Sequence, residues 1–194
     1  MTRLRLRDAR KGQALVEMAL LLPVLLMLFL GSWTASNLID DNNAALQATR
    51  AGARLAAELG NGGSSGATQA QIDTDILDQV YPIVSPQLTN AKVTEIDIYQ
   101  PSGCTGVTPF SSGTCPPNNG AYTPGELIDT YIVSGGVVSS SCGTCTFTLS
   151  NRGQAHPNEA EIGIRLKFTY TSPTLTFFTQ ADSQYTVMRL APTS

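Results

Sequence analysis

The sequence has little charge and a single histidine, and both shortages narrow the functions it can carry. Charged residues are 14% of the 194, and from position 36 onward thirteen acidic side chains face seven basic ones. Nucleic-acid binding needs clustered Lys and Arg, so we expect no nucleic-acid partner. One histidine excludes the paired helical histidines of zinc proteases. Because no pair of general base and nucleophile can be assembled around His156, we expect an exposed loop residue, no enzymatic activity and no cofactor.

Acidic residues occur in two small groups, and neither has the pattern of a metal site. Asp73, Asp75 and Asp78 match a calcium-binding loop only at its first two positions. We interpret them as the solvated face of a helix. Asp40 and Asp41 are interpreted as a polar patch where a helix leaves the membrane. We therefore predict no metal ligand in the chain.

The N-terminus combines a basic segment with a long apolar run. Residues 1–11 carry a net charge of +4, and Ala14–Trp33 is apolar apart from Glu17, Ser32 and Pro23. About 20 apolar residues span a bilayer, whereas a signal peptide has a shorter apolar core. Basic residues next to a membrane span stay in the cytosol. The sequence predicts a single-pass protein of the inner membrane, with a cytoplasmic N-terminus and an extracytoplasmic C-terminal part.

The apolar run continues into an amphipathic helical pattern without a break. Apolar and small residues recur at spacings of three, four and seven up to Leu59, and polar residues occupy the opposite face. The glycines of 60–67 end the pattern and predict a linker. One helix over 13–59, about 70 Å long at 1.5 Å per residue, follows a leader at 1–12. Half of this helix is expected to lie in the membrane and half to protrude.

Residues 68–194 are expected to form a small globular head. Helical spacing predicts a helix over 68–84, which Pro82 and Pro86 end. Alternating patterns predict strands, with 173–182 as the connection between the last two: 92–99, 161–170, 184–190 and, less regularly, 131–138. Residues 101–160 are rich in Gly, Pro, Ser and Thr and are interpreted as a surface insertion. The fold class is α+β, with a small antiparallel β-sheet head behind the long helix.

All the cysteines fall in the insertion, beyond the apolar run: Cys104, Cys115, Cys142 and Cys145. An oxidising compartment favours disulfides. The local pairings Cys104–Cys115 and Cys142–Cys145 are preferred, although the crossed pairings stay open. A zinc site is disfavoured because Cys104 and Cys115 are too widely spaced. A thioredoxin-like role for the CxxC is disfavoured because no helix follows it.

Glu17 is the one residue of the apolar run whose chemistry calls for a partner. An acidic side chain at the bilayer centre costs about 2.5 to 3.5 kcal/mol, so a buried carboxylate needs a cation. The alternative is that Glu17 snorkels to the cytosolic interface.

The segment Arg10-Lys-Gly-Gln-Ala-Leu-Val-Glu17, with the apolar run after it, resembles the N-terminus of TadE-like proteins and, more loosely, of type IV pilins. The helix segment 48–57 and the C-terminal pattern from Ile162 to Pro192 are also similar to that family. The resemblance implies a type IV pilin-like architecture and cleavage by a prepilin peptidase between Gly12 and Gln13. It also implies a role for Glu17 in helix register and assembly.

The resemblance further implies a structural minor pilin or pseudopilin of the Tad (tight adherence) pilus system. Its expected partners are other pilins and pseudopilins, the prepilin peptidase and the Tad secretion and assembly machinery. Met18 follows the glutamate where Flp-type major pilins usually have Tyr, and those pilins are far shorter, which favours a minor subunit. Two alternatives stay open: a tip adhesin whose insertion 101–160 binds a surface or host ligand, and a signal-anchored extracytoplasmic enzyme.

Overall fold

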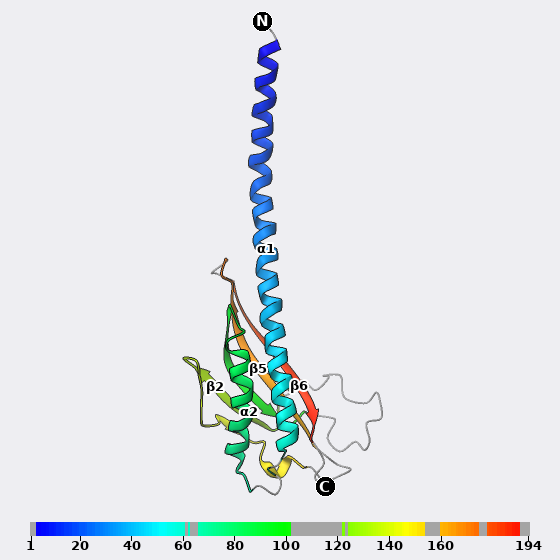
Figure 1. Cartoon of the computed structure of the whole chain (residues 1–194), viewed down its shortest axis with the longest axis vertical. Helices are drawn as coiled ribbons and strands as arrows, with labels where there is room; N and C mark the ends of the chain where they lie inside the picture. The colour runs from blue at the N-terminus through cyan, green and yellow to red at the C-terminus, as the bar shows by residue number, and fades with distance from the viewer. Residues whose placement is uncertain are drawn as a thin grey trace, which may run out of the picture.

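The computed structural model describes residues 3–60, 62, 66–101, 122, 124–153, 160–174 and 178–190. Its dominant element is α1 (Arg3–Leu59), a continuous helix of 57 residues. The predicted helix over 13–59 is confirmed, and its backbone extends further through residues 3–12. Pro23 lies inside α1 without ending it. The N-terminal half of α1 projects out of the head, and its C-terminal half belongs to the head (Figure 1).

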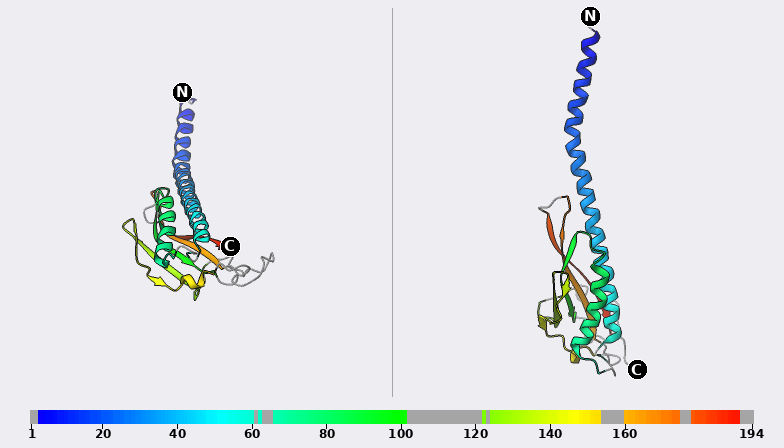
Figure 2. Two further views of the ribbon diagram at one scale, coloured as in Figure 1. Left: turned by 60° about the horizontal axis from the view of Figure 1, so that its bottom comes forward. Right: turned by 60° about the vertical axis from the view of Figure 1, so that its left-hand side comes forward.

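A second helix, α2 (Gln69–Val84), runs back beside the C-terminal half of α1 (Figure 2). Thr68 caps it: its backbone N–H donates to Gln71 Oε1 over 2.8 Å, and its side chain accepts from the Gln71 N–H. This reciprocal capping fixes the start of the helix. Pro82 lies within the last turn and does not end α2, contrary to the sequence prediction, so only Pro86 lies beyond the end.

The helices cover one face of an antiparallel sheet in the order β3-β2-β1-β5-β6, with β4 paired to β2. Its strands are β1 (Ala91–Tyr99), β2 (Ile128–Ser134), β3 (Val137–Val138), β4 (Thr144–Cys145), β5 (Glu161–Thr171) and β6 (Thr179–Arg189). The fold is α+β with a long apolar N-terminal helix and an antiparallel sheet head, as predicted.

Two strand boundaries differ from the sequence prediction. Residues 131–138 form parts of two strands, because Gly135 and Gly136 have φ of 59° and 83° and turn the chain into a hairpin. Two successive positive φ angles are typical of a tight hairpin turn. The connection predicted over 173–182 is shorter, since β6 begins at Thr179 and pairs with Thr171. The polar residues 179–183 lack an apolar alternation, and pairing with β5 makes them a strand.

The core lies between α1, α2 and the inner face of the sheet. The inner residues of β5 are fully buried, as are small residues along α1: Ile162, Ile164, Leu166, Phe168 and Tyr170; Ala45, Ala48, Ala53 and Ala56. Small side chains let the helix approach its neighbours closely. At Gly52 the approach is closest, because a Cβ there would lie 2.2 Å from Cγ2 of Val80 in α2.

Tyr122, a residue of the predicted insertion, packs on the outer face of the sheet. The Tyr99 ring lies over Gly163, where an added Cβ would come within 2.4 Å of it. Tyr122 stacks edge-on against Tyr99 with ring centroids 5.9 Å apart. The Arg165 guanidinium lies 4.2 Å from the Tyr122 ring centroid and forms an ion pair of 2.7 Å with buried Asp97. These contacts attach Tyr122 to the sheet.

Candidate functional site

The N-terminal half of α1 exposes an unbroken apolar surface. Large apolar side chains from Leu15 to Phe29 are each more than half exposed. The helix contains one candidate membrane span by length and composition, and the most apolar part of that span has no contact with the head. From Ala44 onward the same helix buries its small residues against the head. One helix could therefore span a membrane at one end and support a folded domain at the other.

Glu17 and Gln13 lie one turn apart on this surface. The Gln13 Nε2 donates a hydrogen bond of 3.1 Å to Glu17 Oε1, and Glu17 makes no ion pair within the part of the chain that the structure describes. Gly12 belongs to the helical backbone just before them. The structure thus places the predicted cleavage position and Glu17 on adjacent turns, and the cleavage itself stays a prediction.

Asp41 corrects the interpretation of the acidic pair in α1. Its carboxylate is buried and accepts the backbone N–H of Thr89 over 2.9 Å and of Asn90 over 3.3 Å. These N–H groups belong to the loop between α2 and β1, so Asp41 connects three elements. Asp40 is exposed, as a polar patch requires. The sequence predicted one role for both residues, but the helical rotation of about 100° between neighbouring residues turns only Asp41 toward the head.

A buried ionic cluster is the main feature of the head that sequence reasoning missed. Arg152 pairs through Nη1 with Asp73 Oδ1 at 2.7 Å and through Nη2 with Asp129 Oδ2 at 2.8 Å, and all three side chains are buried. The Tyr131 hydroxyl donates to Asp73 Oδ2 over 2.8 Å, and Gln69 Nε2 donates to Asp129 Oδ2 over 2.7 Å. Asp73 is therefore not on a solvated helix face, whereas Asp75 and Asp78 are exposed.

The cluster joins α2 and β2 to the segment that follows the cysteines. The Phe147 N–H donates to Asp129 Oδ1 over 3.0 Å, and its carbonyl accepts from Arg152 Nη2 over 3.2 Å. Burial, with the like charge of Asp73 as the next cause, raises the pKa of Asp129 to about 6. Two carboxylates and one guanidinium leave this site with a surplus negative charge when both acids are ionised. The stability of such a buried, half-neutralised cluster depends on whether its carboxylates are protonated.

The cysteine-bearing segment lies next to this cluster. Cys142 and Cys145 form a disulfide with their Cα atoms 5.8 Å apart, as preferred from sequence, and Cys145 belongs to β4 at the sheet edge. Cys104, Cys115 and His156 lie outside the described residues. Among the described residues, no group of three or more His, Cys, Asp or Glu side chains is placed to hold a metal ion.

The arrangement combines an exposed apolar helix, a junction between that helix and the head, and a surface segment with a disulfide. Residues 12–54 match the family model described as TadE-like protein, which agrees with the resemblance seen in the sequence. That family is a pilus-associated structural family and not an enzyme family. The matched segment lies within α1, so the similarity concerns this helix. No curated protein and no solved structure matches the chain.

Proposed function

We propose, starting from the TadE-like sequence of residues 12–54, that this protein is a structural minor pilin or pseudopilin that takes part in assembling a Tad-type pilus. The observation that carries the proposal is the division of α1. Its apolar half is exposed in the monomer, and its second half packs one face against the head. A helix that is hydrophobic all round needs lipid or other helices around it. The bare half therefore lies in the inner membrane before assembly and packs among pilin helices afterwards.

Processing prepares the helix for that packing. Cleavage between Gly12 and Gln13 leaves an α-amino group on Gln13, which is positively charged at neutral pH. This cation lies about one helical turn from Glu17, on the same chain or on a neighbouring one. Pairing the two charges offsets the cost of burying either of them, and removing one leaves the other uncompensated. Apolar contacts supply the attraction between helices, and the charge pair sets their register.

The processing step is tested by sequencing the N-terminus of the mature protein in a host with an active prepilin peptidase. We expect it to begin at Gln13. A protein that keeps Met1, or one that begins after Ser36, would contradict the proposed leader.

The assembly step is tested with Glu17→Gln, which removes the charge and keeps the shape of the side chain. Membrane insertion should persist because the segment becomes more apolar. We expect less protein in sheared pili and less co-purification with other pilins. Glu58→Gln is the matched control, since Glu58 is an exposed acid of the same helix beyond the apolar run that ends at Trp33. Wild-type levels of both readouts for Glu17→Gln would mean that Glu17 only snorkels to the interface.

A tip adhesin is the second candidate, and the rigid attachment of the insertion supports it. The Cys142–Cys145 disulfide and the buried Arg152 cluster hold the C-terminal part of the insertion on the head. The genes beside this one distinguish the alternatives. A neighbouring prepilin peptidase and secretion ATPase would support pilus assembly. An operon of hydrolases would support the third and weakest alternative, a signal-anchored enzyme.

A further inference from the structure

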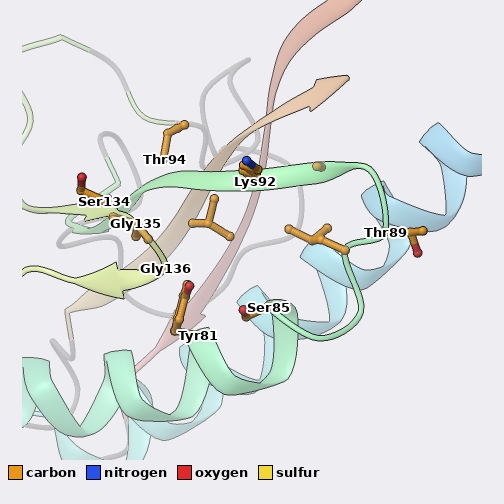
Figure 3. Close-up of a pocket in the computed structure, with 12 residues that line it drawn as sticks. Tyr81, Ser85, Thr89, Lys92, Thr94, Ser134, Gly135 and Gly136 are labelled. Carbon is orange, nitrogen blue, oxygen red and sulfur yellow. The ribbon is translucent and has the colours of Figure 1, made fainter. Parts of the chain in front are cut away.

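A groove of about 740 Å³ lies in the head between the C-terminal half of α2, the start of β1 and the β2–β3 turn (Figure 3). It is separate from the bare helix and from the buried ionic cluster. Its volume lies in the range of sites that bind small molecules and short peptides, about 300 to 1,000 Å³. Hydroxyl groups, one lysine and two glycines line it, together with apolar side chains: Tyr81, Ser85, Thr89, Lys92, Thr94, Ser134, Gly135 and Gly136; Leu88, Ala91, Val93 and Val133.

One wall of the groove is a strand edge without a partner. β1 pairs with β5 from Ala91 onward, but it pairs with β2 only over 95–99. Beyond Ile132, β2 turns away and pairs with β3. Within the part of the chain that the structure describes, residues 91–94 therefore have a neighbouring strand on one side only. The far edge of β2, in contrast, is covered by β3 and β4. An open edge offers backbone N–H and C=O groups to an added strand.

Most polar side chains around this edge make no bond within the described residues; Thr94 is an exception, because its hydroxyl donates to the Lys167 carbonyl over 3.2 Å. The hydroxyls of Tyr81, Ser85, Thr89 and Ser134 and the ammonium of Lys92 make no side-chain hydrogen bond or ion pair within the part of the chain that the structure describes. At Gly136 the nearest atom to an added Cβ is the Tyr81 hydroxyl, 3.6 Å away. Two glycines at the turn thus keep this end of the groove open. Lys92 is the only charged residue of the lining.

We propose that this groove binds an extended acidic peptide segment of a partner protein, which adds as a strand to residues 91–94 of β1. Ladder hydrogen bonds to a free edge give such binding its affinity, and pockets for alternate side chains give it specificity. Leu88, Val93 and Val133 offer the apolar contacts, and the single positive charge of Lys92 selects for an acidic segment. The proposal concerns the head alone and does not depend on the assembly role.

The test uses the full chain in lipid nanodiscs and fluorescein-labelled, N-acetylated hexapeptides of alternating Val and Thr with Glu at one position. Fluorescence polarisation should detect binding, and replacing the Glu by Lys should weaken it. Lys92→Glu should weaken binding about tenfold or more, and Tyr81→Phe should weaken it about two- to tenfold. Arg54→Glu is the matched control, because it reverses an exposed charge on α1 away from the groove. It should leave affinity unchanged.

Two readouts distinguish strand addition from other binding. Peptides N-methylated at alternate residues keep their side chains but lose ladder donors, and they should not bind. Hydrogen exchange of the amides of residues 91–94 should slow when the unmodified peptide binds. Equal affinity of the methylated peptides, or no peptide binding up to millimolar concentration, would overturn the proposal. Binding of oligogalacturonate without amide protection would assign the groove to an acidic sugar and would overturn it equally.

Discussion

At the scale of single residues, burial separates side chains that look alike in the sequence. Asp40 and Asp41 are neighbours, and Asp73 belongs to the same short run as Asp75 and Asp78, yet only Asp41 and Asp73 are buried. Helical spacing could have indicated their direction, since Asp73 is adjacent to buried Ile72 and four residues before Leu77. The partners of these two buried carboxylates could not be predicted from the sequence. Arg152 lies 79 positions from Asp73, in a Gly/Ser-rich stretch with no periodicity, so only the fold brings the two together.

The acidic pair of α1 gives the cleanest residue-scale prediction. Asp41→Ala removes the acceptor of two backbone N–H groups and should lower the free energy of unfolding by about 1.5 to 3 kcal/mol. Asp40→Ala removes an exposed charge and should change it by less than about 0.5 kcal/mol. Urea unfolding of both variants in the same detergent measures the difference. Equal losses would mean that the Asp41 hydrogen bonds do not stabilise the head.

The ionic cluster predicts a pH dependence of stability. The pKa of Asp129 rises from 3.8 to about 6 on folding, through burial first and then through Asp73. The folded state therefore binds the proton more tightly than the unfolded state. The stabilisation that follows is fully present below about pH 4 and is lost as the pH rises through about 6. Wild-type protein should lose stability over this window relative to Asp129→Asn, as urea unfolding at pH 4, 5, 6 and 7 would show. Parallel curves for the two proteins would contradict the prediction.

At the scale of elements, the spacing of apolar residues predicted the helices and the strand that bury one face against the core. The 3.6-residue pattern located α1 and α2, and the strict alternation over 161–170 located β5, because each buries one face against the core. The start of β2 and the first residues of β6 were missed, since their polar sequences become strands through pairing with neighbours. The groove beside β1 could not be predicted, because it depends on where β2 leaves the sheet.

The close contact of α1 with α2 predicts that replacing Gly52 by alanine destabilises the protein, although alanine favours a helix. Gly52→Ala favours the helix by up to about 1 kcal/mol, but its Cβ would lie 2.2 Å from Val80 Cγ2 and would force the helices apart. Overpacking of this kind costs about 1 to 3 kcal/mol, so we expect a net loss of stability. Gly31→Ala is the control in the same helix, because nothing lies within 4 Å of its added Cβ. Adding Val80→Ala should restore the stability that Gly52→Ala loses. If stability is not restored, the strain does not arise from the contact with Val80.

At the scale of the whole molecule, the charge differs between the two ends of the chain. Residues 1–11, the proposed leader, carry +4, and the chain from residue 36 onward carries −6. We expect that replacing Arg3, Arg5, Arg7, Arg10 and Lys11 with Gln weakens the orientation signal. In a host without a prepilin peptidase, protease added outside spheroplasts should digest the wild-type head and leave part of the variant protected.

Arg50→Gln with Arg54→Gln is the control for this experiment, because it removes basic charge from the half of α1 that packs in the head. Its head should be digested like the wild type. Complete digestion of the leader variant would show that other features of the chain set the orientation.

The β5–β6 hairpin has a mechanical consequence for the joined helix and head. It extends beside α1 as far as Thr34, whose hydroxyl lies 3.0 Å from that of Thr174 and whose carbonyl accepts from the Tyr170 hydroxyl over 3.3 Å. Further along, the Gln184 side chain donates to Asn42 Oδ1, and the Thr49 and Thr186 hydroxyls form a hydrogen bond. These hydrogen bonds hold the helix to the sheet from the end of its apolar run onward. The helix continues through this region without a break (Figure 1). Any torque on the head is therefore transmitted to the apolar half of α1, so the two halves of the helix rotate together.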